Sequence, residues 1–278
     1  IAPEFVADGY LLPAASFSDR ARLFRRLREE HELKYPVVLK PNVGQRGAGF
    51  KVIKSDSDLN NYLSRVPYDL ILQRYIPDEK EVGIFYYSLP GAKRGEIFAV
   101  TQKIFPVVVG NGRSTLEELI ALDKRASLIA KTYLDRFPDA RNQVLAKNHV
   151  LRLVEAGNHC QGCIFRDGQH LFSHELRDRI DQISKALPGF FIGRYDIRYS
   201  SNDDLRRGEN FKIIELNGAA SEATNVYDAR NSLLDAYRTL YRQWELVYAI
   251  GRANRDRGHR SPGVWSIWKD LSSYRSAA

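Results

Sequence analysis

Residues 190–217 contain two apolar, strand-like runs joined by a polar turn, and each run carries polar residues at alternate positions. Arg194 and Asp196 alternate with apolar residues in the first run, and Glu215 and Asn217 do so in the second. Successive side chains of a strand point to opposite faces, so both members of each polar pair lie on one face. If the two strands pair, we expect all four side chains to meet.

Two carboxylates and one amide oxygen, from Asp196, Glu215 and Asn217, form a set of hard oxygen donors. Such a set suits Mg²⁺, with Mn²⁺ as an alternative, at a site that bridges nucleotide phosphates, and it does not suit zinc. Arg194 beside them is positioned to bind a phosphoryl oxygen. The simpler alternative is an ion pair at the end of a hairpin. However, Glu215 follows an apolar run, where a charge needs a partner, so the residues favour a metal site.

An apolar strand that ends in a lysine precedes a glycine-rich segment. Residues 35–41 end in Lys40 and a proline, which positions the lysine to reach a bound anion. Gly44, Gly47 and Gly49 then allow backbone N–H groups to converge on a phosphate. Their spacing matches neither the dinucleotide fingerprint nor the Walker motif. We therefore expect a flap over a triphosphate, with a plain glycine hairpin as the alternative.

Hydrophobic periodicity predicts the remaining elements, with alternation indicating strands and apolar residues three or four apart indicating helices. A capping box, formed by Ser114 with Glu117 or by Thr115 with Glu118, opens one helix. We expect residues 5–13 to be an irregular lead-in. Strands are expected within residues 35–41, 51–53, 70–76, 81–88, 96–103, 190–198 and 211–217, and helices within residues 19–34, 57–63, 115–120, 126–148, 176–186 and 232–253.

The last of these helices has a continuous apolar face, which we expect to pack on the core. Its members are Leu233, Leu234, Tyr237, Leu240, Trp244, Val247 and Ile250. Residues 252–260 are basic, and the two tryptophans near the end lie at helical spacing. The predicted organisation is a lead-in segment and helix (residues 1–35), a small lobe (36–77), a large lobe (78–250) and a basic tail (251–278).

Composition narrows the class of protein without identifying a ligand. With 278 residues, 44% hydrophobic and 27% charged, the chain reads as an ordinary soluble globular protein. No apolar run approaches the roughly 18 residues of a membrane helix, and no signal peptide is visible, so we expect a cytoplasmic location. The first residue is Ile and Met is absent, so we expect that something upstream was removed or left out.

A net charge of +8 favours anionic ligands. Nucleic acid is disfavoured as a partner, because the basic run at 252–260 lacks interleaved aromatic residues. Cys160 and Cys163 form a CxxC motif, which can be a redox pair or half of a zinc site. Without a second CxxC or a suitably spaced histidine, we interpret them as two reduced thiols.

Together, the Lys40 strand, the glycine flap, Gln-Arg-Tyr-Ile at residues 73–76 and the two polar pairs at 194–196 and 215–217 resemble the ATP-grasp ligases, especially D-alanine–D-alanine ligase-like members. The resemblance spans residues 5–245. Residues 108–119 are similar to the corresponding stretch of cyanophycin synthetase and bifunctional glutathione synthetases. The resemblance implies an α+β ATP-grasp fold, in which two lobes of antiparallel sheets with flanking helices hold ATP between them.

The resemblance also implies roles for single residues. Lys40 would contact the α- and β-phosphates beneath the flap, Lys103 or Arg194 the γ-phosphate, and Glu81 the ribose. The adenine hinge would be Gln73, Arg74, Tyr75 and Ile76, and two Mg²⁺ ions would be held by Asp196, Glu215 and Asn217. Two departures from the family pattern are visible: Gln73 stands where an acidic residue is common, and residues 218–224 lack the usual proline-bearing loop.

The implied reaction transfers the γ-phosphoryl group to a carboxylate, and an amine then attacks the acyl phosphate. Phosphoryl transfer needs positioning and charge neutralisation and no protein nucleophile, which agrees with the absence of a Ser-His-Asp or Cys-His arrangement. We expect small-molecule or peptide carboxylate and amine substrates. The candidate substrate contacts are Arg113, Asn158, Ser221, Glu222 and Thr224. A phosphotransferase and a non-catalytic basic nucleic-acid-binding module remain as alternatives, and the oligomeric state is open.

Overall fold

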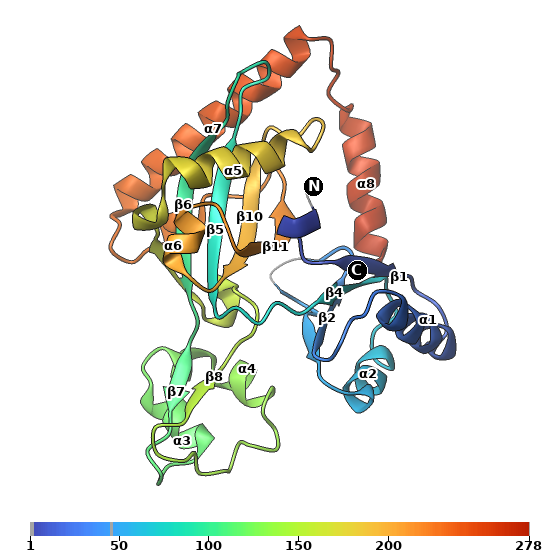
Figure 1. Cartoon of the computed structure of the whole chain (residues 1–278), viewed down its shortest axis with the longest axis vertical. Helices are drawn as coiled ribbons and strands as arrows, with labels where there is room; N and C mark the ends of the chain where they lie inside the picture. The colour runs from blue at the N-terminus through green and yellow to red at the C-terminus, as the bar shows by residue number, and fades with distance from the viewer. Residues whose placement is uncertain (1–2, 45–46, 278) are drawn as a thin grey trace.

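The structure, a computed structural model, describes residues 3–44 and 47–277, with side chains up to residue 272. It is a mixed α+β fold of two large antiparallel sheets with flanking helices and a smaller two-stranded sheet (Figure 1). This confirms the α+β class with antiparallel sheets and flanking helices that the family resemblance implies. Within the described residues no helix has both the length and the apolar character needed to cross a bilayer.

The smaller of the two large sheets has the strand order β1-β4-β2-β3. Its strands are β1 (Gly9–Leu12), β2 (Val37–Pro41), β3 (Lys51–Ile53) and β4 (Leu70–Arg74), and its helices are α1 (Phe17–Glu30) and α2 (Asp56–Leu63). Phe24, Leu39, Leu59 and Leu72 form the centre of its core. The segment expected to be an irregular lead-in contains β1, which pairs with β4, so this lobe begins before residue 36.

The five-stranded sheet has the order β11-β10-β5-β6-β9. Its strands are β5 (Lys80–Tyr87), β6 (Glu96–Ile104), β9 (Ile164–Asp167), β10 (Ile192–Tyr199) and β11 (Phe211–Asn217). Helix α5 (His174–Lys185) covers one face, and α7 (Leu233–Asp256) runs along the other (Figure 1). Separate hydrophobic clusters form on the two faces, because the strands alternate apolar side chains between them.

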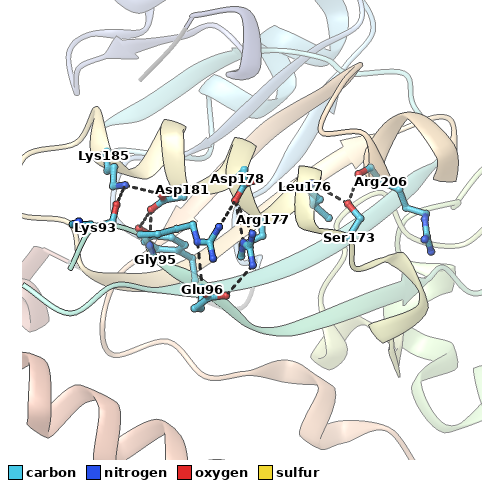
Figure 2. Close-up of polar contacts among 12 residues, drawn as sticks. Lys93, Gly95, Glu96, Ser173, Leu176, Arg177, Asp178, Asp181, Lys185 and Arg206 are labelled. Carbon is cyan, nitrogen blue, oxygen red and sulfur yellow. Dashed lines mark hydrogen bonds and ion pairs between the residues drawn. The ribbon is translucent and has the colours of Figure 1, made fainter.

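Polar contacts anchor α5 to the strands beneath it (Figure 2). The Ser173 hydroxyl caps the helix by accepting the N–H of Leu176. One turn from the other end, Asp181 accepts hydrogen bonds from the N–H of Gly95 and the hydroxyl of Tyr86, and it pairs with Lys185 at 2.7 Å. These bonds hold α5 across the start of β6.

A third region lies between β6 and β9 and has its own core. It contains β7 (Val107–Val109), β8 (Val150–Arg152), α3 (Leu116–Leu122) and α4 (Ala130–Leu134). The capping box at the start of α3 is Thr115 with Glu118. The helix expected over residues 126–148 is replaced by a 3₁₀ turn at Ala126–Ile129 followed directly by the short α4. Pro138 disfavours helical backbone at the residue before it, and turns follow.

The remaining helices of the described residues are the short α6 (Asn202–Arg206), the longer α8 (Val264–Ala277) and five 3₁₀ helices, Pro3–Phe5, Ala126–Ile129, His159–Gln161, Gln169–Leu171 and Thr224–Tyr227. The segment expected to be a tail therefore contains the end of α7 and all of α8. The expectation that one apolar face of α7 packs on the core is wrong for Leu233, Leu234, Tyr237 and Trp244, which are exposed. The sheet is instead covered by the side that carries Leu246, Val247 and Ile250.

Candidate functional site

Strands β10 and β11 pair in antiparallel orientation and bring the predicted polar residues together. Arg194 lies opposite Asn217, and Asp196 lies opposite Glu215. Residues directly opposite in an antiparallel pair share a face. The register therefore places all four side chains on the same face of the sheet, as the sequence predicts if the two strands pair. A register shift directly after Asp196 ends this regular stretch of pairing.

Asp196 is the most heavily contacted member of the cluster. Its Oδ1 accepts from Lys103 Nζ at 3.1 Å and from Arg194 Nε at 3.1 Å, while Asn217 Nδ2 lies 3.4 Å from Oδ2. Burial by itself raises the pKa of this carboxyl, but the charges of Lys103 and Arg194 outweigh burial and leave the pKa below its usual value. Asp196 is therefore ionised at neutral pH.

A row of buried charges crosses three neighbouring strands beside Asp196. Glu81 on β5 lies opposite Arg198 on β10 and Lys103 on β6. Its two carboxylate oxygens bind Arg198 Nε at 3.0 Å and Lys103 Nζ at 2.8 Å. Burial opposes the charge of Lys103, but Asp196 and Glu81 outweigh it and raise the pKa of the ammonium group. Gly157 closes over the row: a Cβ at that position would lie 2.1 Å from Glu81 Oε1.

The row of buried charges changes the expectation that Glu81 contacts a ribose, and it includes Arg198, which was not singled out from the sequence. Glu81 is 2% exposed with both oxygens engaged, so in this conformation it is covered and not open to a ribose. Arg198 also donates to the backbone carbonyls of Asp78 and Glu155, joining the segment after β4 to the segment after β8. Its alternation with Arg194 and Asp196 on β10 was the sequence signal for it.

Glu215 differs from its neighbours, because its carboxylate makes no hydrogen bond or ion pair with any residue that the structure describes. Although Glu215 is exposed, desolvation by the protein around it raises the pKa of its carboxyl, and the charge of Asp196 raises this pKa further. Lys40, Lys103 and Arg194 act in the opposite direction. The Glu215 carboxyl is thus exposed and also interacts electrostatically with charged residues on β2, β6 and β10. It therefore lies in an open cleft between these strands.

The four-stranded sheet contributes two side chains to this cleft. Lys40 Nζ donates to the backbone carbonyl of Ile214 at 3.0 Å, and Gln73 Nε2 donates to the same oxygen at 3.2 Å. Desolvation lowers the pKa of Lys40, against the opposing influence of Glu215 and Asp196. The strand that ends in Lys40 thus faces β11, and the lysine lies within electrostatic reach of both carboxylates.

The predicted flap lies partly outside the described residues, because residues 45 and 46 are not among them. Gly47 and Gly49 both have positive φ angles, +69° and +71°, which only glycine adopts without strain. A Cβ on Gly49 would lie 2.7 Å from Pro41. The role of Gly44, Gly47 and Gly49 in covering a phosphate remains a prediction.

The expected hinge residues point in different directions. Gln73 faces the cleft, whereas Arg74 lies on the other side of the strand and pairs with Asp8 at 2.8 Å. Ile76 is buried. A cavity of about 480 Å³ lies on the Arg74 side, with Tyr75 also in its lining. None of its lining residues is Asp196, Glu215 or Asn217, so this cavity is separate from the carboxylate cluster.

Three of the five candidate substrate contacts lie beside Arg194. Its Nη1 donates to the carbonyl of Glu222 at 3.0 Å. Thr224 is buried near Gly83, and its hydroxyl has no hydrogen-bond partner among the described residues. Ser221 donates to the carbonyl of Gly218 at the end of β11.

The other two candidates lie in the third region. Asn158 Oδ1 accepts the N–H of Cys160 and caps a short helix. Arg113 precedes α3, and its backbone binds Asn111 Oδ1. Figure 1 shows α3 at the end of the molecule away from β10 and β11, so the structure does not bring Arg113 to the cluster.

The residues of the cluster fit a divalent cation of the Mg²⁺ type. Glu215 carries a carboxylate without a described partner, directly opposite a second carboxylate, and Asn217 adds an amide oxygen. Desolvation and then the charge of Asp196 raise the pKa of Glu215, and a cation between the two carboxylates would offset their repulsion. Among the described residues, no group of three or more His, Cys, Asp or Glu side chains is arranged to hold a metal. The donors here are two carboxylates and an amide, as hard cations prefer.

The cysteines take no part in this cluster. Both are free: Cys160 is exposed and Cys163 is buried. Burial raises the pKa of the Cys163 thiol to about 12, so it stays protonated and unreactive at neutral pH. Both observations fit two reduced thiols.

No family model matches the chain. Solved structures of similar fold include D-alanine–D-alanine ligase from Bacillus anthracis, with TM-score 0.44, 14% identity and coverage of 92% of this chain and 64% of that chain. A D-cycloserine synthetase has TM-score 0.44, 13% identity and coverage of 87% and 66%. A bifunctional glutathione synthetase from Pasteurella multocida has TM-score 0.39, 16% identity and coverage of 87% and 34%. This chain thus spans a third to two thirds of their lengths. The likeness is one of fold.

Proposed function

We propose that this chain is an ATP- and Mg²⁺-dependent ligase that activates a carboxylate as an acyl phosphate and joins it to an amine. One observation carries the proposal: Asp196, Glu215 and Asn217 converge on two paired strands, and Lys40 reaches the same cleft from the other sheet. A cluster of hard oxygen donors facing a lysine matches the needs of a metal-bound triphosphate.

In this proposal the carboxylates bind metal and the basic residues bind phosphate. Asp196, Glu215 and Asn217 hold one or two Mg²⁺ ions, which neutralise charge on the phosphates when bound. Lys40 contacts the α- and β-phosphates beneath the glycine flap, and the adenine lies against the hinge at residues 73–76. Because Lys103 is held between Glu81 and Asp196, its position is fixed before any substrate binds.

Arg194 has the geometry to orient the reacting groups. Its Nε is bound by Asp196, and its Nη1 by the carbonyl of Glu222. The guanidinium is therefore fixed between the carboxylate cluster and the loop after β11. We assign to it the stabilisation of negative charge on the phosphoryl group as the transfer proceeds. The neighbouring loop, with Ser221, Glu222 and Thr224, is the proposed contact surface for the carboxylate and amine substrates.

Trapping with hydroxylamine tests the reaction class directly. The protein is incubated with ATP, Mg²⁺ and hydroxylamine together with each member of a panel of carboxylic acids and amino acids. An acyl phosphate reacts with hydroxylamine to give a hydroxamate, so hydroxamate and ADP should appear together for at least one acid. Asp196→Asn should lower this rate by about 100-fold or more, whereas Asp178→Asn, an exposed change on α5, should not.

The alternative reaction has a different product. A phosphotransferase that places the phosphoryl group on a hydroxyl gives ADP and a stable phosphorylated compound without hydroxamate. Release of ADP with such a product, and no hydroxamate for any acid, would replace the ligase proposal. If Mg²⁺-dependent nucleotide binding is absent and Asp196→Asn changes nothing, the metal–triphosphate site itself is wrong.

A further inference from the structure

One face of α7 carries large apolar side chains that the rest of the described chain leaves uncovered. Leu234, Tyr237, Tyr241, Trp244 and Tyr248 are each 57–68% exposed. They follow one another at intervals of three, four, three and four residues, which places them in one stripe along the helix, with the spacing of a coiled-coil seam. We call these five residues the α7 stripe. The face that covers the sheet lies on the other side of the helix.

Opposite charges lie along one side of the α7 stripe. A shallow groove of about 370 Å³ is lined by Leu234, Tyr237, Arg238, Tyr241, Arg242 and Glu245. Arg238 and Glu245 are seven residues apart, hence two turns apart on the same side of the helix. Both are exposed. Among the described residues Arg238 pairs only with the neighbouring Asp235, at 3.4 Å on the exposed surface, a weak contact that can be exchanged for another.

We propose that the α7 stripe is a dimerisation surface that packs against the same stripe of a second copy of this chain, with the two helices antiparallel. The stripe is nearly symmetric about Tyr241, because Leu234 and Tyr248 lie seven residues on either side of it. A two-fold axis near Tyr241 makes the two stripes cover each other. The contact is then self-complementary and closes as a dimer.

The flanking charges fit this orientation. With the axis near Tyr241, Arg238 lies beside Glu245 of the partner subunit, and the symmetry repeats the pair on the other half of the interface. In a parallel arrangement the flank that carries Arg238 and Glu245 on one copy lies on the opposite side of the interface from the same flank of the other copy, so these residues would form no ion pair across it. The charge pattern therefore selects the antiparallel pair.

Other occupants fit the surface less well. An anionic lipid surface favours basic residues on both sides of an apolar stripe, but here Glu245 and Asp235 lie beside it. Helix α8 of the same chain does not cover the stripe: Figure 1 shows it leaving the end of α7 and running toward β1. A second copy supplies both the apolar surface and the matching charges.

Sedimentation velocity of the whole chain over a wide range of concentration tests the proposal. We expect a monomer–dimer equilibrium. Trp244→Ser removes apolar contact, and Arg238→Glu and Glu245→Arg each place like charges together. Each variant should weaken the dimer by about tenfold or more. An equal mixture of Arg238→Glu and Glu245→Arg should dimerise again, since every flanking pair is then of opposite charge, and the double variant should dimerise with itself.

Two controls match these changes elsewhere on the surface. Arg22→Glu on α1 alters net charge as Arg238→Glu does, and the double change Trp265→Ser, Trp268→Ser removes exposed tryptophans from α8. Both should keep the dimer. Since all these residues are exposed, thermal unfolding of the monomer should not change.

A chain that stays monomeric at every concentration overturns the proposal, as does a mixture that fails to restore dimerisation. Loss of the dimer in the α8 variant but not in Trp244→Ser would assign the interface to α8. Co-sedimentation of the monomeric chain with phosphatidylserine vesicles, lost on Trp244→Ser, would assign the α7 stripe to a lipid surface.

Discussion

At the level of single residues, the carboxyl of Glu215 is exposed, yet its ionised form is disfavoured by its surroundings. Its pKa is raised from 4.5, first by its protein surroundings and then by Asp196, so the folded protein holds the proton more tightly than the unfolded chain does. The protonated form therefore favours folding, and ionisation opposes it. This destabilisation is absent below the unfolded pKa near 4.5 and complete above the raised folded pKa.

Replacing Glu215 with Gln should therefore stabilise the metal-free protein at neutral pH while removing a metal ligand. Because the side chain is exposed, we expect less than about 1 kcal/mol, or up to about 3 °C in Tm. The difference should vanish below pH 4.5, and Mg²⁺-dependent activity should fall by about 100-fold or more. Thermal unfolding measured from pH 4 to 8 checks the stability, with the exposed Glu29→Gln on α1 as control. A lower Tm at neutral pH would contradict this account of Glu215.

At the level of elements, the alternation along β10 and β11 was sufficient to predict which side chains share a face. The two strands were visible in the sequence, and their pairing follows from the turn between them. The row that joins Arg198, Glu81 and Lys103 was not predictable, because it depends on β5 lying between β10 and β6. The covered state of Glu81 depends on the loop at Gly157, which is distant in sequence.

The exposure of the α7 stripe was likewise not predictable from the local sequence pattern. An apolar face predicts burial, but α7 has apolar residues on two sides, and periodicity alone does not say which side meets the sheet. The end of the predicted helix after residue 134 was also missed, although Pro138 was the signal for it. The local pattern therefore predicted the elements well, and contacts between distant segments decided the rest.

The absence of a side chain at Gly83 gives Arg194 the space it needs to bind Asp196. Gly83 on β5 lies opposite Asp196 on β10, and a Cβ there would lie 3.4 Å from Asp196 Oδ1 and 3.2 Å from Arg194 Cδ. The missing side chain leaves room above the strand for the Arg194 side chain to reach Asp196, which it binds at 3.1 Å.

Gly83→Val should push the Arg194 side chain away from Asp196. We expect a loss of stability of about 1–3 kcal/mol from overpacking and a fall in activity of about tenfold or more. Gly9→Val on β1 is the matched control, because the nearest atom to a Cβ there is at an ordinary contact distance of 3.4 Å. Denaturant unfolding and the hydroxamate rate measure the two effects. Equal behaviour of the two variants would show that the space above Gly83 is not needed.

At the level of the whole molecule, the two large sheets meet where Lys40 and Gln73 both donate to the carbonyl of Ile214. These are contacts from β2 and β4 on one sheet to β11 on the other. Across this junction the charges of Glu215 and Asp196 act to raise the pKa of Lys40, against the desolvation that lowers it. If the cleft binds a metal–triphosphate, the bound anion should join the two sheets more firmly than two hydrogen bonds to one carbonyl.

Lys40→Met separates the role of this junction in the fold from its role in binding. Desolvation leaves the pKa of Lys40 below 10.5, so its charge opposes folding at pH values below the lowered pKa, and this cost disappears above 10.5. At neutral pH the substitution removes that cost together with a hydrogen bond worth about 1 kcal/mol, and the two changes offset each other. We expect the Tm of the unliganded protein to change by only a few degrees.

The response to ligand should change much more. A non-hydrolysable ATP analogue with Mg²⁺, at 100 times its Kd, stabilises a protein by about 2.7 kcal/mol, which corresponds to a rise in Tm of roughly 5–10 °C for a chain of this size. Lys40→Met should abolish this rise, and Lys51→Met, an exposed lysine on β3, should retain it. Differential scanning fluorimetry with and without Mg²⁺ measures both variants. A full ligand-induced rise in Lys40→Met would mean that the nucleotide binds without the four-stranded sheet, and the cleft between the sheets would not be its site.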